Sequence, residues 1–162
     1  MIIVRQEFKE IVENIKTKHN HALLEFYDGN KYEVEQIINS KDKENTKFNK
    51  YPCIVLEMPF KWKPSEFNNL NEISLNNIRL LIVASAELEE RNDKRYETKF
   101  IPVLFPLLDQ LVEEMNIYNQ IQTFEIIDVI EHPYYGTKQT IGNDKWETIE
   151  IIMSVDFKKN CK

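Results

Sequence analysis

The most hydrophobic stretch of the chain is NIRLLIVASA, residues 77–86. Short apolar runs rich in branched side chains are typical of strands that are covered on both faces. We therefore expect residues 77–86 to form a central strand of a sheet. The other elements of the fold then have to pair with this strand or cover it.

A second strand pattern covers residues 146–157. Apolar side chains alternate there with polar ones, as in an antiparallel strand with one buried face. The apolar positions are Ile149, Ile151, Met153, Val155 and Phe157. Residues 123–131 form another strand-like run, and a long turn, HPYYGTKQTIGND, separates the two. We therefore expect a closing hairpin. Residues 51–58, an apolar run with prolines at its ends, predict one more buried strand.

Two amphipathic helices are also predicted. In the first, apolar residues recur at helical spacing and the pattern ends near Lys18. They are Val4, Phe8, Ile11, Val12 and Ile15. The second helix shows the same spacing at Tyr96, Phe100, Val103, Leu104, Leu107, Leu108, Leu111, Val112 and Met115.

The second helical pattern contains Pro102 and Pro106. Proline removes a backbone hydrogen bond from a helix interior and crowds the preceding turn. The helix therefore either starts near Thr98 and bends at Pro106, which we favour, or becomes regular only from Pro106.

The segments between these elements are less regular. Two strand-like runs flank Asp28 and Gly29, whose tolerance of positive φ favours a tight hairpin turn. Residues 39–50 are almost entirely polar and predict a mobile loop. Trp62 and Phe67 are expected to fix the irregular segment around them to the core.

The expected order of elements is helix, hairpin, strand, strand, helix, hairpin. This order predicts an α+β fold, with a single mixed, mainly antiparallel sheet and two main helices packed on one face. The 162 residues suit one domain of ordinary size. We therefore expect residues 1–162 to form a single domain, with a flexible C-terminal tail at 158–162.

The composition argues against several classes of protein. Gly-rich phosphate loops are almost excluded because the chain has 3 glycines. The net charge of −6 disfavours non-specific nucleic-acid binding, which needs a basic surface. No run approaches the ~20 apolar residues of a membrane span. The N-terminal residues turn charged after Val4, unlike a signal peptide, so we expect a protein that is cytoplasmic where it is made.

No residue pattern predicts a catalytic centre. His19 and His21 lack further ligands at a spacing that would complete a metal site, and a solvated helix end is the better interpretation. Nothing near His132 reads as a nucleophile with an orienting acid. We therefore expect no catalytic residue, no cofactor and no bound metal, and so a protein that is not an enzyme. Cys53, within an apolar run, is expected to be a buried thiol.

Two charged features are expected at the surface. The carboxylate pairs Glu89 with Glu90 and Glu113 with Glu114 fit solvated faces. The tripeptide Lys61-Trp62-Lys63 has the basic and aromatic mix of a single-strand binder, but it is short and the net charge opposes that role.

Motif residues in the second half of the chain carry a family resemblance. The central strand leads through a charged loop into a helix of the type R-Y-x-x-x-F-x-P-x-x-x-P-L. A strand, a turn and a closing strand of roughly the type D-x-(W or another hydrophobic residue)-x-x-I-E-I follow. The matching residues are Arg95, Tyr96, Phe100, Pro102, Pro106 and Leu107, then Asp144, Trp146, Ile149, Glu150 and Ile151. Over about residues 51–157, this succession resembles the tail-terminator (tail-completion, minor tail) proteins of long-tailed phages and prophages.

The resemblance implies a non-enzymatic virion assembly protein. Proteins of this family form rings, commonly hexamers, on the end of the tail tube, where they stop tube polymerisation. The implied partners are other copies of the chain, the tail tube protein and the head-side connector protein. The implied location is the host cytoplasm during assembly and the tail or neck of the virion afterwards.

The charged segment before the second helix is the predicted interface between subunits. Alternating signs suit a contact between identical copies, although a solvated loop explains the same pattern. The segment contains Glu87, Glu89, Glu90, Arg91, Asp93, Lys94 and Arg95. Two other functions remain open, namely a head–tail connector or neck adaptor, and a small module that binds a ligand or a single strand through residues 60–67.

Overall fold

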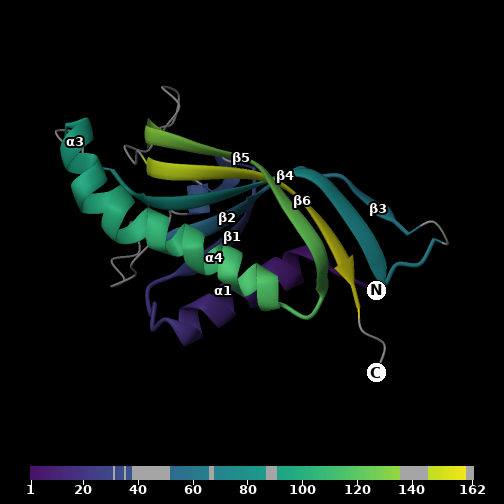
Figure 1. Cartoon of the computed structure of the whole chain (residues 1–162). Helices are drawn as coiled ribbons and strands as arrows, with labels where there is room; N and C mark the ends of the chain where they lie inside the picture. The colour runs from purple at the N-terminus through teal and green to yellow at the C-terminus, as the bar shows by residue number, and fades with distance from the viewer. Residues whose placement is uncertain are drawn as a thin grey trace.

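The computed structural model describes residues 1–30, 32–34, 36–37, 52–65, 68–86, 91–135 and 146–159. These residues form an α+β fold built on one six-stranded, mostly antiparallel sheet (Figure 1). The strands are β1 (Glu25–Gly29), β2 (Cys53–Glu57), β3 (Trp62–Pro64), β4 (Glu72–Ser85), β5 (Ile121–Tyr135) and β6 (Trp146–Lys158). The helices are α1 (Val4–Lys18), α3 (Asn92–Arg95), η1 (Tyr96–Leu104) and α4 (Phe105–Ile117).

The sheet has the order β1-β2-β4-β6-β5, and β3 pairs with the first part of β4. As predicted, β4 contains the run 77–86 up to Ser85 and lies inside the sheet. The closing hairpin of β5 and β6 is also confirmed. Its turn includes residues 136–145, which lie outside the described part of the chain.

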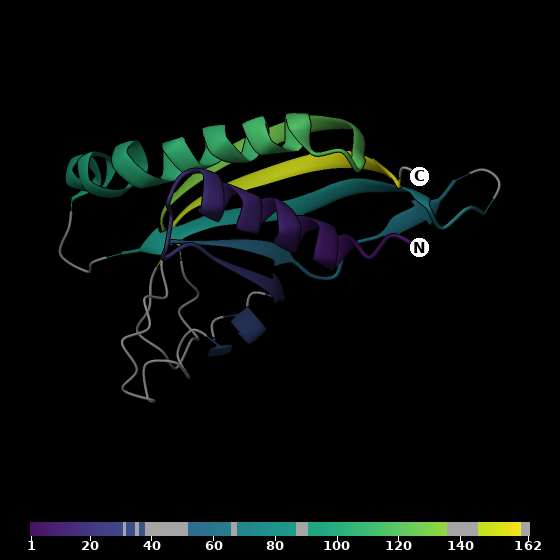
Figure 2. The same ribbon diagram turned by 90° about the horizontal axis from the view of Figure 1, so that it is seen from below.

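Both long helices cover the same face of the sheet (Figure 2). The predicted apolar stripe of α1 is buried there against the inward-facing residues of β4 and β6. A smaller apolar cluster lies on the opposite face, where Val34 packs with residues that include Cys53 and Trp146. Cys53 is fully buried, as expected. The sheet is therefore covered on both faces around the β2 and β4 residues of this smaller cluster.

The predicted hairpin at Asp28 and Gly29 was wrong. β1 ends at Gly29, residues 32–34 and 36–37 are helical, and β1 pairs in parallel with β2. A parallel pair needs a crossover rather than a tight turn. Asn30 begins this crossover with a capping box, because its side chain accepts from the amide of Glu33 at 2.9 Å while Glu33 accepts from the amide of Asn30 at 3.0 Å.

The second long helix begins earlier than expected, at Asn92 instead of near Thr98. Residues Tyr96–Leu104 form a π-helix, in which the amide of Phe105 donates to the carbonyl of Phe100, five residues back. Pro102 lies inside this wider turn, which avoids the α-helical bond that proline cannot make. Pro106 then occupies the first turn of α4, where amides lack helical partners in any case.

Two smaller expectations also need correction. Trp62 does not fix its segment to the core, because it lies in β3 and its side chain is 47% exposed; Phe67 is outside the described residues. Lys158 is the last residue of β6, and the Lys159 amide donates to the carbonyl of Asn71. Part of the expected flexible tail is therefore held in place, while residues 160–162, like the predicted loop 39–50, lie outside the described residues.

Candidate assembly surfaces

The predicted interface segment divides into parts with different surroundings. Glu87, Glu89 and Glu90 belong to residues 87–90, which the structure does not describe. The elements α3, η1 and α4 follow one another without a break, and we call them together the rod. Arg91, Asp93 and Lys94 are exposed at the outer end of the rod (Figure 1). Residues 92–95 are helical, so this part of the predicted loop is the first turn of a helix.

Arg95 is not an exposed interface residue. Its side chain is buried and forms an ion pair with the fully buried carboxylate of Glu147 in β6. The arginine sits one residue before η1, so this contact fixes the start of the rod to the sheet. The loss of either partner would leave the other charge buried without compensation. Arg95 therefore holds the helix and the sheet together and is not available for contact with a partner.

The neighbouring residue, Tyr96, connects the rod to the outer strand of the sheet. Its hydroxyl donates a hydrogen bond to the carboxylate of Glu131 in β5. This hydrogen bond raises the pKa of Tyr96, and burial adds to the effect. The exposed charges of α3 therefore lie close to the last residues of β5 and belong to the same side of the molecule.

The strand β5 forms one edge of the sheet and exposes an apolar group that sequence reasoning missed. Ile127, Val129 and Ile130 are 45%, 45% and 38% exposed, and the acidic residues Glu125 and Asp128, also exposed, lie on either side of Ile127 in the sequence. Val129 pairs with the core residue Ile151 and Ile130 pairs with Glu150 on the other face, so the group surrounds the edge strand from both faces of the sheet. We use the name β5 patch for Glu125, Ile127, Asp128, Val129 and Ile130. The sequence FEIIDVIE does contain a signal, since an antiparallel strand with one buried face needs apolar residues only at alternate positions.

A second exposed apolar group lies on the arm formed by β3 and the start of β4. Met1, Ile3, Trp62 and Leu70 are all more than 40% exposed, and Lys61 and Lys63 flank the tryptophan. The amide of Ile2 donates to the carbonyl of Leu70 at 3.0 Å, which holds the N-terminus against the arm. We use the name arm patch for Met1, Ile3, Lys61, Trp62, Lys63 and Leu70. This group is therefore a candidate interaction surface.

A row of polar side chains crosses four strands on the sheet face away from the long helices. His132 Nε2 lies 2.7 Å from Glu150 Oε2, and the other carboxylate oxygen of Glu150 lies 3.3 Å from Arg79 Nε. Arg79 also approaches Glu57 at 3.6 Å. These residues come from β5, β6, β4 and β2, and no pattern in the sequence connects them. Arg79 lies between the carboxylates of Glu57 and Glu150, so the row joins neighbouring strands.

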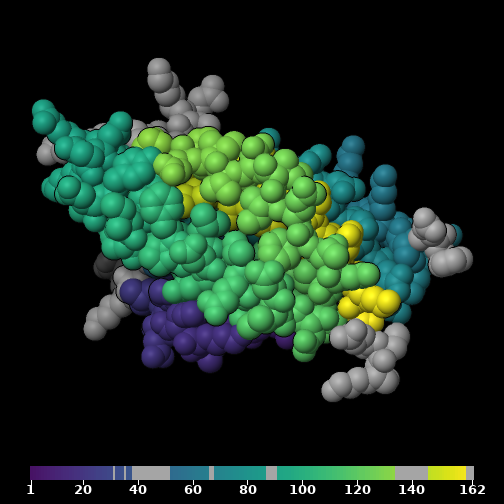
Figure 3. Space-filling model, in the orientation of Figure 1, coloured from purple at the N-terminus to yellow at the C-terminus, as the bar shows by residue number. Residues whose placement is uncertain are grey.

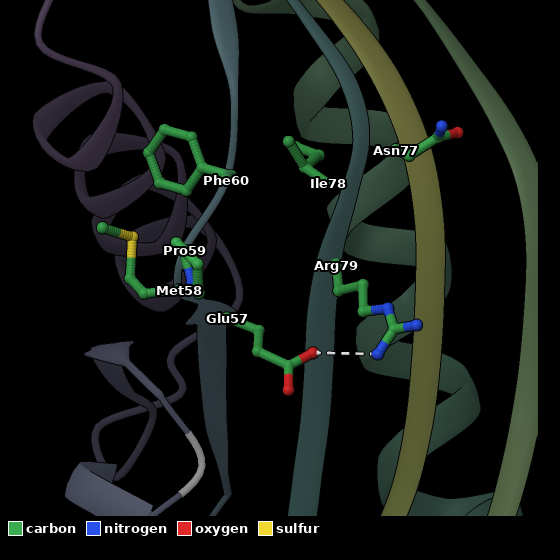
Figure 4. Close-up of a pocket in the computed structure, with 7 residues that line it drawn as sticks. All are labelled: Glu57, Met58, Pro59, Phe60, Asn77, Ile78 and Arg79. Carbon is green, nitrogen blue, oxygen red and sulfur yellow. Dashed lines mark ion pairs between the residues drawn. The ribbon is translucent and has the colours of Figure 1, made fainter.

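A small hollow lies at the end of this row. The side chains of Glu57 and Arg79 meet across it, and Met58, Pro59 and Phe60 line one side (Figure 4). Its volume is about 210 Å³, below the roughly 300–1,000 Å³ that is usual for small-molecule sites. The hollow therefore offers little support for a ligand-binding function.

His21, just after the end of α1, contributes to packing between elements. His21 Nε2 lies 2.7 Å from Gln110 Oε1, so this side chain contacts α4.

Among the described residues, no group of three or more His, Cys, Asp or Glu side chains is placed to hold a metal ion. Across the same described residues, none of the helices is both long and apolar enough to cross a membrane.

Glu114 differs from the solvated face that the sequence predicted. It is buried, accepts a hydrogen bond from the side-chain amide of Asn14 at 2.8 Å and pairs with Lys18. Both partners belong to α1, so Glu114 joins the two long helices. Its neighbour Glu113 is exposed, as expected.

Comparisons with known proteins do not assign a family. The chain matches no protein-family model, and no curated protein sequence matches it either.

Proposed function

We propose that this protein is a non-enzymatic virion assembly protein that resembles a tail terminator. Copies of it form a ring on the end of a phage tail tube, stop the polymerisation of the tube and present a surface to the head-side connector. A head–tail connector or neck adaptor is the closest alternative, because both functions depend on ring contacts between copies.

The observation that carries the proposal is the β5 patch. A sheet edge that exposes three aliphatic side chains and two carboxylates is suited to contact with a neighbouring subunit.

The positions of the motif residues are consistent with the resemblance. Arg95 through Leu107 lie on one continuous helical rod over the sheet, and Trp146 through Ile151 lie on the strand β6 beneath it. Arg95 and Glu147 connect the two motif segments directly. The motif thus corresponds to one packed unit, and it leaves the exposed surfaces on either side to form contacts with partners.

The proposal is tested by measuring assembly of the purified chain. We expect a monomer or weak oligomer at low concentration, which shifts to closed rings at high concentration or when tail tube ends are added. Analytical ultracentrifugation gives the masses, and electron microscopy shows whether closed rings form and where they bind. A chain that stays monomeric at every concentration and binds no tube end would refute the proposal.

One observation favours a second candidate function, the binding of single-stranded nucleic acid. Trp62 is 47% exposed between two exposed lysines, and bases stack on aromatic side chains in such sites. A titration of tryptophan fluorescence with single-stranded oligonucleotides at two salt concentrations tests it. Because Trp146 is buried, quenching that is lost in Trp62→Ala would report the arm, and the absence of quenching would remove this candidate.

A further inference from the structure

We propose that the arm patch of one copy binds the β5 patch of the next copy, in a head-to-tail contact. This inference rests on the proposed function, because it names the interface through which the ring forms. The occupant of each patch is a second copy of this chain.

The first argument is the position of the two patches in the sheet. β6 pairs with one side of β4, and β3 pairs with the other side. β5 lies beyond β6 and forms the opposite edge. The arm patch and the β5 patch therefore lie at opposite edges of one sheet, as the separated β5 and β3 regions in Figure 3 illustrate. They cannot meet within one chain, but they can meet between chains.

The second argument is complementary charge. The arm patch carries Lys61 and Lys63, whereas the β5 patch carries Glu125 and Asp128. Lys63 and Trp62 point to opposite faces of β3, so the charged and apolar groups surround this edge of the sheet from both faces. Opposite charges attract, while two copies of the same patch would place like charges together. The charges therefore favour the contact of unlike patches over a symmetric dimer.

The third argument is what such a contact builds. Contacts between unlike patches generate a closed ring when the rotation between copies closes, and an open filament when it does not. A symmetric contact between identical patches would stop at two copies. The placement of unlike patches on opposite edges is thus the arrangement that a ring-forming protein requires.

The test reverses the charges of each patch separately and then together. One variant carries Lys61→Glu with Lys63→Glu, a second carries Glu125→Lys with Asp128→Lys, and a third carries all four changes. We expect each two-site variant to lower the association constant by about tenfold or more, because like charges then face each other. The four-site variant should recover the parent constant to within about threefold, because the opposite charges are restored with their positions exchanged.

Two further measurements make the test specific. Lys9 is exposed on α1, outside both patches, so Lys9→Glu is the control and should leave association unchanged. In a Cys161→Ser background, a chain with Trp62→Cys mixed with a chain with Val129→Cys should form a cross-linked pair with a short bismaleimide. Melting temperatures confirm that each variant is folded.

The outcomes separate the interface from the function. If the parent forms rings but the two-site variants assemble equally well, or if the four-site variant stays as weak as they are, the proposed interface is wrong and the proposed function stands. If cross-links form only between identical cysteine variants, the contact is symmetric and the inference is also wrong. If the parent never associates, both proposals fall.

Discussion

The guanidinium of Arg95 and the carboxylate of Glu147 form an ion pair inside the protein, between α3 and β6. Removal of one charge from a buried pair leaves the other charge without its compensation, which destabilises more than the pair itself stabilises. The two residues are therefore expected to act as a unit in folding.

We predict that Arg95→Leu lowers the free energy of unfolding by about 3–5 kcal/mol. The double variant Arg95→Leu with Glu147→Leu should recover much of that loss, because it buries no uncompensated charge. Urea unfolding followed by circular dichroism measures both. A loss below about 1 kcal/mol in the single variant would show that the pair is not an important part of the core.

A second prediction concerns Tyr118, which is buried where α4 ends. Its hydroxyl lies 2.7 Å from Glu7 Oε2 and 3.0 Å from Glu10 Oε2 on α1. Burial, and then the hydrogen bond and charge of Glu7, raise the pKa of Tyr118 above its ordinary value of 10.0. In the folded protein the phenol therefore keeps its proton at pH values where the unfolded chain has lost it.

The sign of the pH effect follows from this difference. The contribution of Tyr118 to stability is fully present below pH ~10 and decreases as the pH rises above that value, because the unfolded state then binds fewer protons. We expect the difference in unfolding free energy between the parent and Tyr118→Phe to be constant from pH ~7 to ~9 and to shrink above pH ~10. Burial also raises the pKa of Tyr27, to about 12, but both proteins share that residue. A difference that does not change up to pH ~11 would contradict the assignment.

At the scale of elements, the junction between β1 and the crossover is set by Gly29. Its φ is +150°, and an added Cβ would lie 3.1 Å from the carboxylate of Glu33, which caps the amide of Asn30. A side chain at position 29 is therefore expected to lower stability, as it would in a hairpin turn. The cause here is different, because Gly29 joins the strand β1 to a capped helical segment.

We predict that Gly29→Val lowers the free energy of unfolding by on the order of 1 kcal/mol or more, because valine is strained at positive φ. Ala22→Val, at an exposed site, is the control and should change stability little. Urea unfolding of the two variants gives the comparison. Equal stability of Gly29→Val and the parent would mean that this junction tolerates a side chain.

The regular elements of this fold could be predicted because their patterns repeat. Ile149 to Phe157 alternate over a whole strand, and Val4 to Ile15 mark one face of a whole helix, so both were placed correctly. The parallel pairing of β1 with β2 was missed because Asp28 and Gly29 fit a hairpin turn locally. The capping signal Asn30-x-x-Glu33 was present in the sequence and would have favoured the start of a helical turn.

The candidate surfaces were harder to predict than the elements. Arg95 looked like part of a charged loop, and its burial depends on Glu147, which is 52 residues away in the sequence. The exposure of Ile127 and Val129 depends on β5 being a sheet edge, which the strand pattern alone does not determine. Contacts between distant segments decide both cases, and one sequence does not show them.

At the scale of the whole molecule, the exposed charges of α3 extend the side on which β5 lies. We predict that Arg91→Glu with Lys94→Glu weakens ring formation while the melting temperature stays close to that of the parent, because the cations of α3 contact acidic groups of a neighbouring copy separately from the contact of the β5 patch with the arm patch. Both side chains are exposed, and exposed charges contribute little to folding energy. Sedimentation at several concentrations and a thermal melt measure the two effects separately, and normal assembly of the double variant would exclude α3 from the interface.

The pairing of β4 with β6 has a consequence for how the chain folds during synthesis. Tyr118 contacts Glu7 across 111 residues of sequence, and β6, the neighbour of the apolar strand β4, is translated more than 60 residues after that strand. Proteins dominated by such non-local contacts fold slowly, and an apolar strand that waits for its neighbour is prone to aggregate on the ribosome. We therefore expect the β6 side of β4 to stay unpaired until β6 has left the exit tunnel, and the speed of translation sets how long this exposure lasts.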